Sequence, residues 1–261
     1  MKKTIPLSLL LTLVLFIMPS SQFASADNQE KLDFAAGLEE TLGHFWALEQ
    51  NLEEGNAELA LVHATHPIAE LYDTMKPTLQ ASNPSLDSQV QSTLLNLKDK
   101  AITTVSREQA QLAIEDAKEV VEIARRTIVG DELSNDPNFK MQLMKTLLKT
   151  SIAEYGEAVS NGMITEMAEF QDSSAFVWRS QQIFNEIKSD VDSNESEEIE
   201  EFYEDLWNAY DSRANPSDVD TLAGGIIREL DVVLGVESEE NKLLEYVENI
   251  EDLLKQTKNE Y

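Results

Sequence analysis

The sequence contains no cysteine, which excludes disulfide bonds and thiolate metal ligands. A metal ion would therefore have to be bound by nitrogen and oxygen ligands. Glycine and proline are also scarce, with 9 and 7 residues, and most of them fall where helices are expected to begin or end. No stretch shows the sustained two-residue alternation that is typical of half-buried strands. These absences favour a helical protein without covalent cross-links.

Basic residues are scarce as well. Lysine and arginine together number 20 against 49 acidic residues, giving a net charge of −29 at pH 7. Nucleic acids and anionic membrane surfaces would repel such a chain, so we expect no nucleic-acid partner. Cations, basic protein surfaces or a salty medium are the surroundings that this charge favours. An acidic, solvated surface without any partner would account for the charge equally well.

One long hydrophobic run is present, at the N-terminus. Lys2 and Lys3 precede an apolar stretch from Pro6 to Met18, and Ala24-Ser25-Ala26 provides small residues for cleavage. We predict that residues 1–26 are a signal peptide, and no cysteine follows it for a lipid anchor. No later stretch approaches the ~20 apolar residues of a membrane span. We therefore expect an extracytoplasmic protein, periplasmic or secreted, with no transmembrane segment after cleavage and a net charge of −31, because two lysines are lost.

Start and stop signals predict an all-α protein made of antiparallel helical bundles, with about nine helices. Asn83-Pro84, Asp136-Pro137 and Asn215-Pro216 each look like an N-cap followed by proline at the first helical position. Ser106 and Gln109 resemble a capping box. The helices are expected at about residues 28–53, 57–81, 84–104, 106–129, 136–160, 163–190, 195–212, 216–234 and 238–258.

The domain organisation follows from a predicted break at Gly130 to Asn135. It would separate an N-terminal bundle, residues 27–130, from a C-terminal bundle, residues 131–261. Asn161-Gly162 is flanked by helical patterns, so we predict a helix–helix turn there. The acidic run from Asp190 to Glu201 is expected to be a loop and helix start, since it lacks the spacing and central glycine of an EF-hand calcium loop.

All three histidines lie between Glu39 and Glu70, a stretch that reads as two amphipathic helices joined by a turn at Gly55-Asn56. In an antiparallel hairpin His44 would face His66, and His63 would share the face of His66 because it lies three residues earlier. Glutamates four residues from His44 and His66 would also face each other. Facing helices are where bundles build histidine and carboxylate metal sites. The predicted metal ligands are His44, His63, His66, Glu40 and Glu70.

Pro67 directly follows His66 inside a helical pattern. Proline removes a backbone donor and clashes with the carbonyl of His63, four residues back, so the helix must kink or restart at the histidine pair. One interpretation is a distortion retained for function. In the other, Pro67 simply begins a new helix, His63 points elsewhere and the cluster dissolves.

A second hairpin is predicted around Asn161-Gly162, with acidic residues at helical spacing on both arms. Pairing about this turn would bring Glu154 near Glu169 and Glu157 near Glu166. Like charges that face each other repel unless a cation or bases intervene. The alternative is a stripe that faces water, which is the usual position of charged residues on a helix. The possible second, carboxylate site comprises Glu154, Glu157, Glu166, Glu169 and Asp172.

The segment from Leu147 to Ile187 resembles a stretch in the extracytoplasmic helical domains attached to oxidase-dependent iron permeases. It begins Leu-Leu-Lys-Thr-Ser-Ile-Ala-Glu-Tyr-Gly-Glu-Ala-Val-Ser-Asn-Gly and continues through Glu-Phe-Gln-Asp and Phe-Val. The segment from Ala57 to Lys98 is similar to the preceding part of the same domains. The resemblance implies an all-α domain outside the membrane that acts in the uptake of iron or a related metal.

The permease itself is missing from this sequence. Arg228-Glu229 lies in a short helical pattern rather than in a membrane-embedded Arg-Glu-x-x-Glu motif. The exported, helical imelysin-like iron proteins are similar more loosely. Their His-x-x-Glu signature is absent, since Glu70 follows His66 by four residues.

Catalysis is the less favoured interpretation. The sequence has no cysteine nucleophile, no Gly-x-Ser-x-Gly elbow, no phosphate-binding glycine loop and no His-Glu-x-x-His zinc signature. A metal-dependent oxidase remains conceivable because bundles host such sites, but the repeated Glu-x-x-His of four-helix oxidases is absent. We do not expect an enzyme.

Two functional hypotheses remain. The first is an exported metal-binding protein that captures or delivers a transition metal, iron or copper, for uptake, with a membrane permease as its partner. The second is a non-catalytic helical interaction or sensor module that docks on a membrane partner through its acidic surface. Replacing the histidines should abolish metal binding in the first case and leave docking unchanged in the second.

Overall fold

The computed structural model describes residues 21–102 and 107–236. Three predicted features therefore lie wholly or partly outside the described residues: most of the signal peptide, the capping box at Ser106 and the helix at 238–258. The first helix begins at Ser21 and continues without a break through Ala26, where cleavage is predicted.

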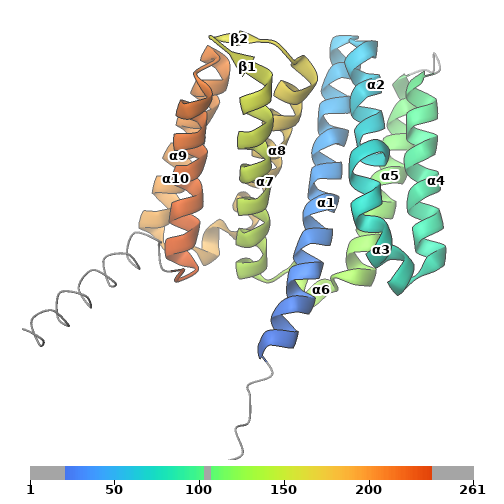
Figure 1. Ribbon diagram of the computed structural model, residues 1–261, viewed down its shortest axis with the longest axis horizontal. Coiled ribbons are helices and arrows are strands. Elements are labelled where there is room, and N and C mark those ends of the chain that lie inside the picture. Colours follow the sequence, from blue (N-terminus) through green and yellow to red (C-terminus); the bar gives the residue numbers. More distant parts are fainter. Residues whose placement is uncertain (1–20, 103–106, 237–261) are drawn as a thin grey trace, which may run out of the picture.

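The described chain is helical almost throughout, which confirms the all-α prediction (Figure 1). The elements in chain order are α1 (Ser21–Glu54), α2 (Ala57–His66), a π-helical turn (Pro67–Leu71), α3 (Tyr72–Ser82), α4 (Pro84–Ile102), α5 (Arg107–Ile128), α6 (Asp131–Ser134), α7 (Pro137–Ala158), β1 (Val159–Ser160), β2 (Met163–Ile164), α8 (Met167–Ile187), a 3-10 turn (Lys188–Asp190), α9 (Ser193–Ser212) and α10 (Pro216–Val233).

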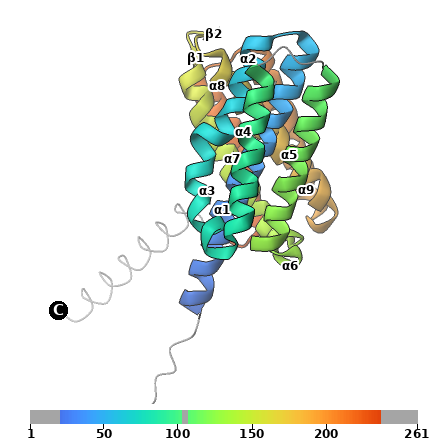
Figure 2. The same ribbon diagram turned by 90° about the vertical axis from the view of Figure 1, so that its right-hand side faces the viewer.

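The helices stand in two groups side by side, α1 to α5 and α7 to α10, with the short α6 between them at one end (Figure 1). Within the first group α4 and α5 run alongside each other (Figure 2). Helix α1 packs against α2 and α5 of its own group and against α7 and α8 of the other. One hydrophobic core continues through both groups. Because the groups share this core, their packing does not separate them, and the division into two domains near residue 130 stays a prediction.

The predicted proline-containing helix starts are present. The Asn83 side chain accepts hydrogen bonds from the amides of Ser85 and Leu86, and the Asp136 side chain accepts one from the amide of Phe139. Asn215 precedes α10 without a side-chain cap. Side-chain caps of this kind satisfy amide groups that the first helical turn leaves unpaired.

Asn161 and Gly162 form the turn of a two-stranded β-hairpin, so the prediction of a plain helix–helix turn is wrong in this respect. Val159 pairs with Ile164, and Ser160 with Met163. Asn161 and Gly162 have φ values of 53° and 71°. A tight hairpin turn requires positive φ at both central residues, which is why Asn-Gly is favoured there. The β-branched Val159 and Ile164 favour the outer of the two strand pairs.

Pro67 opens a π-helical turn that continues α2 into α3. The amide of Tyr72 donates to the carbonyl of Pro67, five residues earlier. The wider turn accommodates the ring of a residue that cannot donate a backbone hydrogen bond. His63 and His66 both precede the distortion on α2.

Two adjacent glycines on α10 provide a matched test of close packing. A Cβ atom on Gly225 would lie 2.5 Å from Cε1 of Phe202 on α9, whereas one on Gly224 would lie 3.6 Å from its nearest neighbour, Arg228. We expect Gly225→Ala to lower the free energy of unfolding by about 1–3 kcal/mol through overpacking. Gly224→Ala should be neutral or stabilise by about 0.5–1 kcal/mol, as alanine does inside a helix. Urea unfolding measures both, and equal stabilities would contradict the packing described here.

Candidate metal centre

Three histidines and one aspartate come together at the junction of the two helix groups. His44 lies on α1, His63 and His66 on α2, and Asp172 on α8. One ligand atom from each of the four side chains lies within 4.8 Å of the others. His44, His63 and Asp172 are buried, and the His66 side chain is 13% exposed. The cluster is therefore inside the protein, with one edge near solvent.

The close packing of α1 on α8 positions His44. A Cβ atom on Gly43 would lie 2.9 Å from Cδ1 of Phe176, so the absence of a side chain at Gly43 lets the two helices approach. Phe176 meets the His44 ring edge-on, with centroids 5.4 Å apart. The aromatic contact restricts the orientation of the imidazole.

The Asp172 carboxylate is the common neighbour of the three imidazoles. Its Oδ1 lies 2.7 Å from Nδ1 of His44 and 3.0 Å from Nδ1 of His63, and its Oδ2 lies 2.9 Å from Nδ1 of His66. All three rings thus turn the same nitrogen toward one carboxylate. Three nitrogens and a carboxylate oxygen form a donor set that first-row transition metals accept.

A pair of side-chain amides lies behind His63, on the side away from Asp172. Asn51 and Gln171 exchange two hydrogen bonds, in which the Gln171 oxygen accepts from the Asn51 amide at 2.9 Å. The same Gln171 oxygen lies 2.7 Å from Nε2 of His63. With Nε2 donating to Gln171, Nδ1 of His63 faces Asp172 with a proton in the doubly protonated ring and with a lone pair in the neutral ring. A second hydrogen-bond partner on the other ring nitrogen is typical of metal-binding histidines.

Nδ1 of His63 and the Asp172 oxygen 3.0 Å away need a proton or a metal ion between them, because two acceptors repel. Nδ1 of His44 is unsatisfied. It is buried and makes no hydrogen bond of acceptable geometry, despite its 2.7 Å approach to Asp172. A buried polar atom without a partner costs about 1–3 kcal/mol. A cation at the centre of the cluster would satisfy both nitrogens.

The electrostatics of the cluster favour an ionised aspartate. Burial opposes the charge on Asp172, but the charge of His44 and hydrogen bonds from the histidines outweigh burial and hold its pKa well below the usual range. Burial also opposes the charge on His66 and by itself would lower its pKa. The negative charges of Asp172, Glu70 and Glu169 outweigh burial, so the pKa of His66 is raised above its usual value. The site thus holds a negative charge that attracts cations.

Two of the five residues predicted as ligands of the histidine site lie outside this group. Glu40 accepts a hydrogen bond of 2.9 Å from Thr150 on α7, and burial raises its pKa. The Glu70 side chain is 58% exposed, and its nearest oxygen is 3.7 Å from Nε2 of His66. The π-helical turn between His66 and Glu70 changes the angular spacing that would otherwise align residues four apart.

The five acidic residues of the second hairpin divide by burial. Glu157 and Glu166 are exposed, Glu154 and Glu169 are half-buried, and Asp172 joins the histidines. Glu154 and Glu169 share a hydrogen bond, as their pairing about the turn predicts. Burial and the neighbouring charge of Glu169 raise the pKa of Glu154 to about 8. This pair therefore holds a proton near neutral pH beside Asp172.

The Glu154–Glu169 pair makes a pH-dependent contribution to stability in the metal-free protein. Between the ordinary pKa of 4.5 and about 8, the unfolded chain releases a proton that the folded protein retains. Stability should therefore fall as the pH rises through this window. We expect Glu154→Gln to flatten that fall, and the exposed neighbour Glu157→Gln to leave it unchanged. Urea unfolding at a series of pH values measures this; identical slopes for Glu154→Gln and the parent would contradict it.

Sequence reasoning missed the link between Asp172 and the histidines, and it missed Asn51 and Gln171 altogether. Asn51 had a signal, since it lies seven residues after His44 and so shares its helix face. Gln171 had none, because its role depends on the packing of α8 against α1 and α2. Of the four residues in the cluster, Asp172 comes from the carboxylate hairpin and the other three come from the histidine hairpin.

Fold and site together define an all-α bundle protein with a three-histidine, one-aspartate cluster between two groups of helices. Residues 130–237 match the family described as the iron permease-associated 4-helix bundle domain. The match confirms the resemblance to iron permease helical domains for this part of the chain. It spans α7 to α10 and includes Asp172, while the three histidines precede it.

No curated protein and no solved structure gives a significant match. Across residues 21–102 and 107–236, no helix is both long enough and apolar enough to cross a membrane.

Proposed function

We propose that this is an exported metal-binding protein that captures or delivers a transition metal ion, iron or copper, for uptake. The observation that carries the proposal is the convergence of three imidazoles on one buried carboxylate. Nδ1 of His44, His63 and His66 lie 2.7, 3.0 and 2.9 Å from the oxygens of Asp172. His44, His63, His66 and Asp172 would be the direct ligands. Glu40 and Glu70 belong to the surroundings of the site.

The donor set restricts which metal ions the site would bind. Three imidazole nitrogens and one carboxylate suit iron, copper, zinc and nickel, and affinity alone would favour copper. The iron permease-associated domain that contains Asp172 supports iron as the cargo. One aspartate charge leaves a bound di- or trivalent ion with excess positive charge, which the nearby Glu154 and Glu169 can reduce by releasing their shared proton.

The proposal places the protein outside the cytoplasm after cleavage at Ala26, near a membrane permease that accepts the ion. The site would be assembled where the predicted bundles 27–130 and 131–261 meet, since the first supplies the histidines and the second Asp172. A site shared between two packed units can open when they separate slightly, which provides a route for release of the ion.

Calorimetric titration of the purified chain with Fe(II), Fe(III), Cu(II) and Zn(II) tests the proposal. The parent should bind one ion per chain, and the His44→Ala, His66→Ala double variant should lose this binding while circular dichroism shows its helices intact. Glu157→Ala and Glu166→Ala, which are exposed, serve as the control for weak binding to acidic surfaces. Equal affinities in the parent and the folded histidine variant would rule the proposal out.

A further inference from the structure

A cavity separate from the metal cluster lies at the α6 end of the junction between the helix groups. It has a volume of about 280 Å³ and is lined from α1, α5, α6, α7 and α8. Four basic side chains line it: Arg125, Arg126, Lys140 and Arg179. The sequence contains only 20 basic residues. Four carboxylates line the same cavity, those of Glu39, Glu122, Asp131 and Glu186. None of the metal-site ligands lines this cavity.

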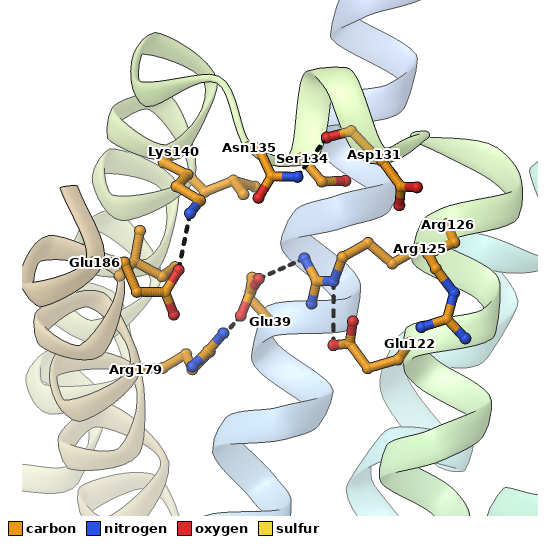
Figure 3. Close-up of a pocket in the computed structure, with 12 residues that line it drawn as sticks. Glu39, Glu122, Arg125, Arg126, Asp131, Ser134, Asn135, Lys140, Arg179 and Glu186 are labelled. Atoms are coloured by element: carbon orange, nitrogen blue, oxygen red, sulfur yellow. Dashed lines mark hydrogen bonds and ion pairs between the residues drawn. The ribbon is translucent and has the colours of Figure 1, made fainter.

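Most acidic side chains around the cavity are already neutralised. Glu39 is buried between two guanidinium groups, accepting from Nη1 of Arg125 at 2.6 Å and from Nε of Arg179 (Figure 3). Arg125 also donates from Nε to Glu122 at 3.2 Å. These bonds use two of the three nitrogens of the Arg125 guanidinium.

The carboxylate of Glu186 pairs with Lys140 at 2.9 Å on another side of the cavity (Figure 3). Glu39, Glu122 and Glu186 thus each have a cationic partner. Asp131, the fourth carboxylate, is exposed. The basic groups retain unused donor capacity, because each guanidinium has five N–H bonds and an ammonium has three.

Two buried donors at this cavity have no hydrogen-bond partner. They are Nη2 of Arg125, the third nitrogen of that guanidinium, and Oγ of Ser134. Both residues line the same cavity. A buried donor without an acceptor is costly, and more so when it carries charge. A group that satisfied these donors would have to supply acceptor atoms.

We propose that this cavity binds a small oxyanion, a phosphate or a short polycarboxylate, through Nη2 of Arg125 and Oγ of Ser134. Arg126, exposed at the rim, contributes positive charge that attracts the anion. Guanidinium groups match the paired oxygens of carboxylate and phosphate, and hydrogen bonds between ionised groups are about twice as strong as neutral ones. Buried ion pairs are also screened little by salt.

The size of the cavity restricts the ligand. Ligand pockets usually occupy ~300–1,000 Å³, and this one, at about 280 Å³, is below that range. A nucleotide is too large, whereas inorganic phosphate and citrate remain. The two probes share oxyanion chemistry and differ in shape and charge, so their relative affinities distinguish the two sources.

The test is calorimetric titration of the metal-free full chain with inorganic phosphate and, separately, with citrate, against a constant chloride background. Ser134→Ala removes one of the proposed donors with almost no change in volume, and Arg126→Gln removes a rim charge. Arg125 itself is left intact because it also neutralises Glu39. Ser212→Ala and Arg213→Gln, on exposed residues at the end of α9, are the matched controls.

We expect saturable binding of one probe per chain, weakened about tenfold or more by Ser134→Ala, the loss expected for a hydrogen bond to a charged group. Arg126→Gln should weaken it several-fold, and the controls should bind as the parent does. Absence of saturable binding of either probe in the millimolar range would overturn the proposal. Equal affinity in the parent and in both site variants would do the same, since the anion would then bind elsewhere.

Discussion

Replacing Asp172 by asparagine is expected to weaken metal binding by about 100-fold or more. Substitutions that only support a metal ligand already cost about 10–100-fold, and Asp172 is proposed as a direct ligand. The asparagine keeps the volume of the side chain but removes the one charge that all three imidazoles face. Calorimetric titration with the metal that the parent binds most tightly measures the loss.

Asp172 also makes a pH-dependent contribution to the stability of the folded protein. The pKa of Asp172 is lowered in the folded protein, so its stabilising contribution is present above the ordinary pKa of 3.8 and is lost as the pH falls below it. Metal titrations belong near pH 7, where the parent carries the full charge. Asp116→Asn, an exposed acid on α5, controls for the change in net charge. Similar metal affinities in Asp172→Asn and the parent would contradict the ligand role.

Replacing Glu39 by glutamine is expected to destabilise the protein by about 3 kcal/mol or more. Glu39 is 2% exposed and is paired with Arg125 and Arg179. Removing one partner from a buried ionic network leaves the other charges uncompensated, which typically costs about 3–5 kcal/mol. At about 2–4 °C per kcal/mol for a chain of this size, the melting temperature should fall by roughly 10 °C.

The matched control for Glu39 is Glu49 on the same helix. It pairs with Lys118 at 2.8 Å, where the lysine and glutamate side chains are 39% and 22% exposed. Partly exposed pairs contribute about 1 kcal/mol or less, so Glu49→Gln should shift the melting temperature only slightly. Thermal unfolding at pH 7 measures both variants. Equal shifts in melting temperature would show that the Glu39 network contributes no more to stability than a partly exposed ion pair does.

The histidine hairpin was predictable from local sequence rules. A glycine and an asparagine set the turn, and helical spacing placed His63 and His66 on the face opposite His44. The structure brings the three rings together, with centroids 5.1–6.2 Å apart. Such a prediction succeeds because it depends on one short connection and one repeat length.

The position of Asp172 was not predictable in this way. Its carboxylate reaches the histidines only because α8 packs on α1, more than 100 residues away along the chain. The pattern around Asp172 identified an acidic stripe, and helical periodicity cannot tell which member of a stripe is buried against another helix.

The Glu39 network and the β-hairpin show two further limits. Glu39 had a signal, since an acid flanked at helical spacing by Ala35, Leu42 and Trp46 lies on an otherwise apolar stripe. Its arginine partners lie on α5 and α8, and no local rule links them. At Asn161-Gly162 the turn chemistry for a hairpin was present, but the helical patterns on both sides outweighed it in the prediction.

The proposed metal site is tested most directly by a crystal structure of the protein loaded with iron or copper, with diffraction data collected at the absorption edge of the metal. We expect one anomalous peak about 2 Å from Nδ1 of His44, His63 and His66 and from a carboxylate oxygen of Asp172. A loaded protein whose anomalous peak lies elsewhere, with these four side chains unchanged, would contradict the proposed site.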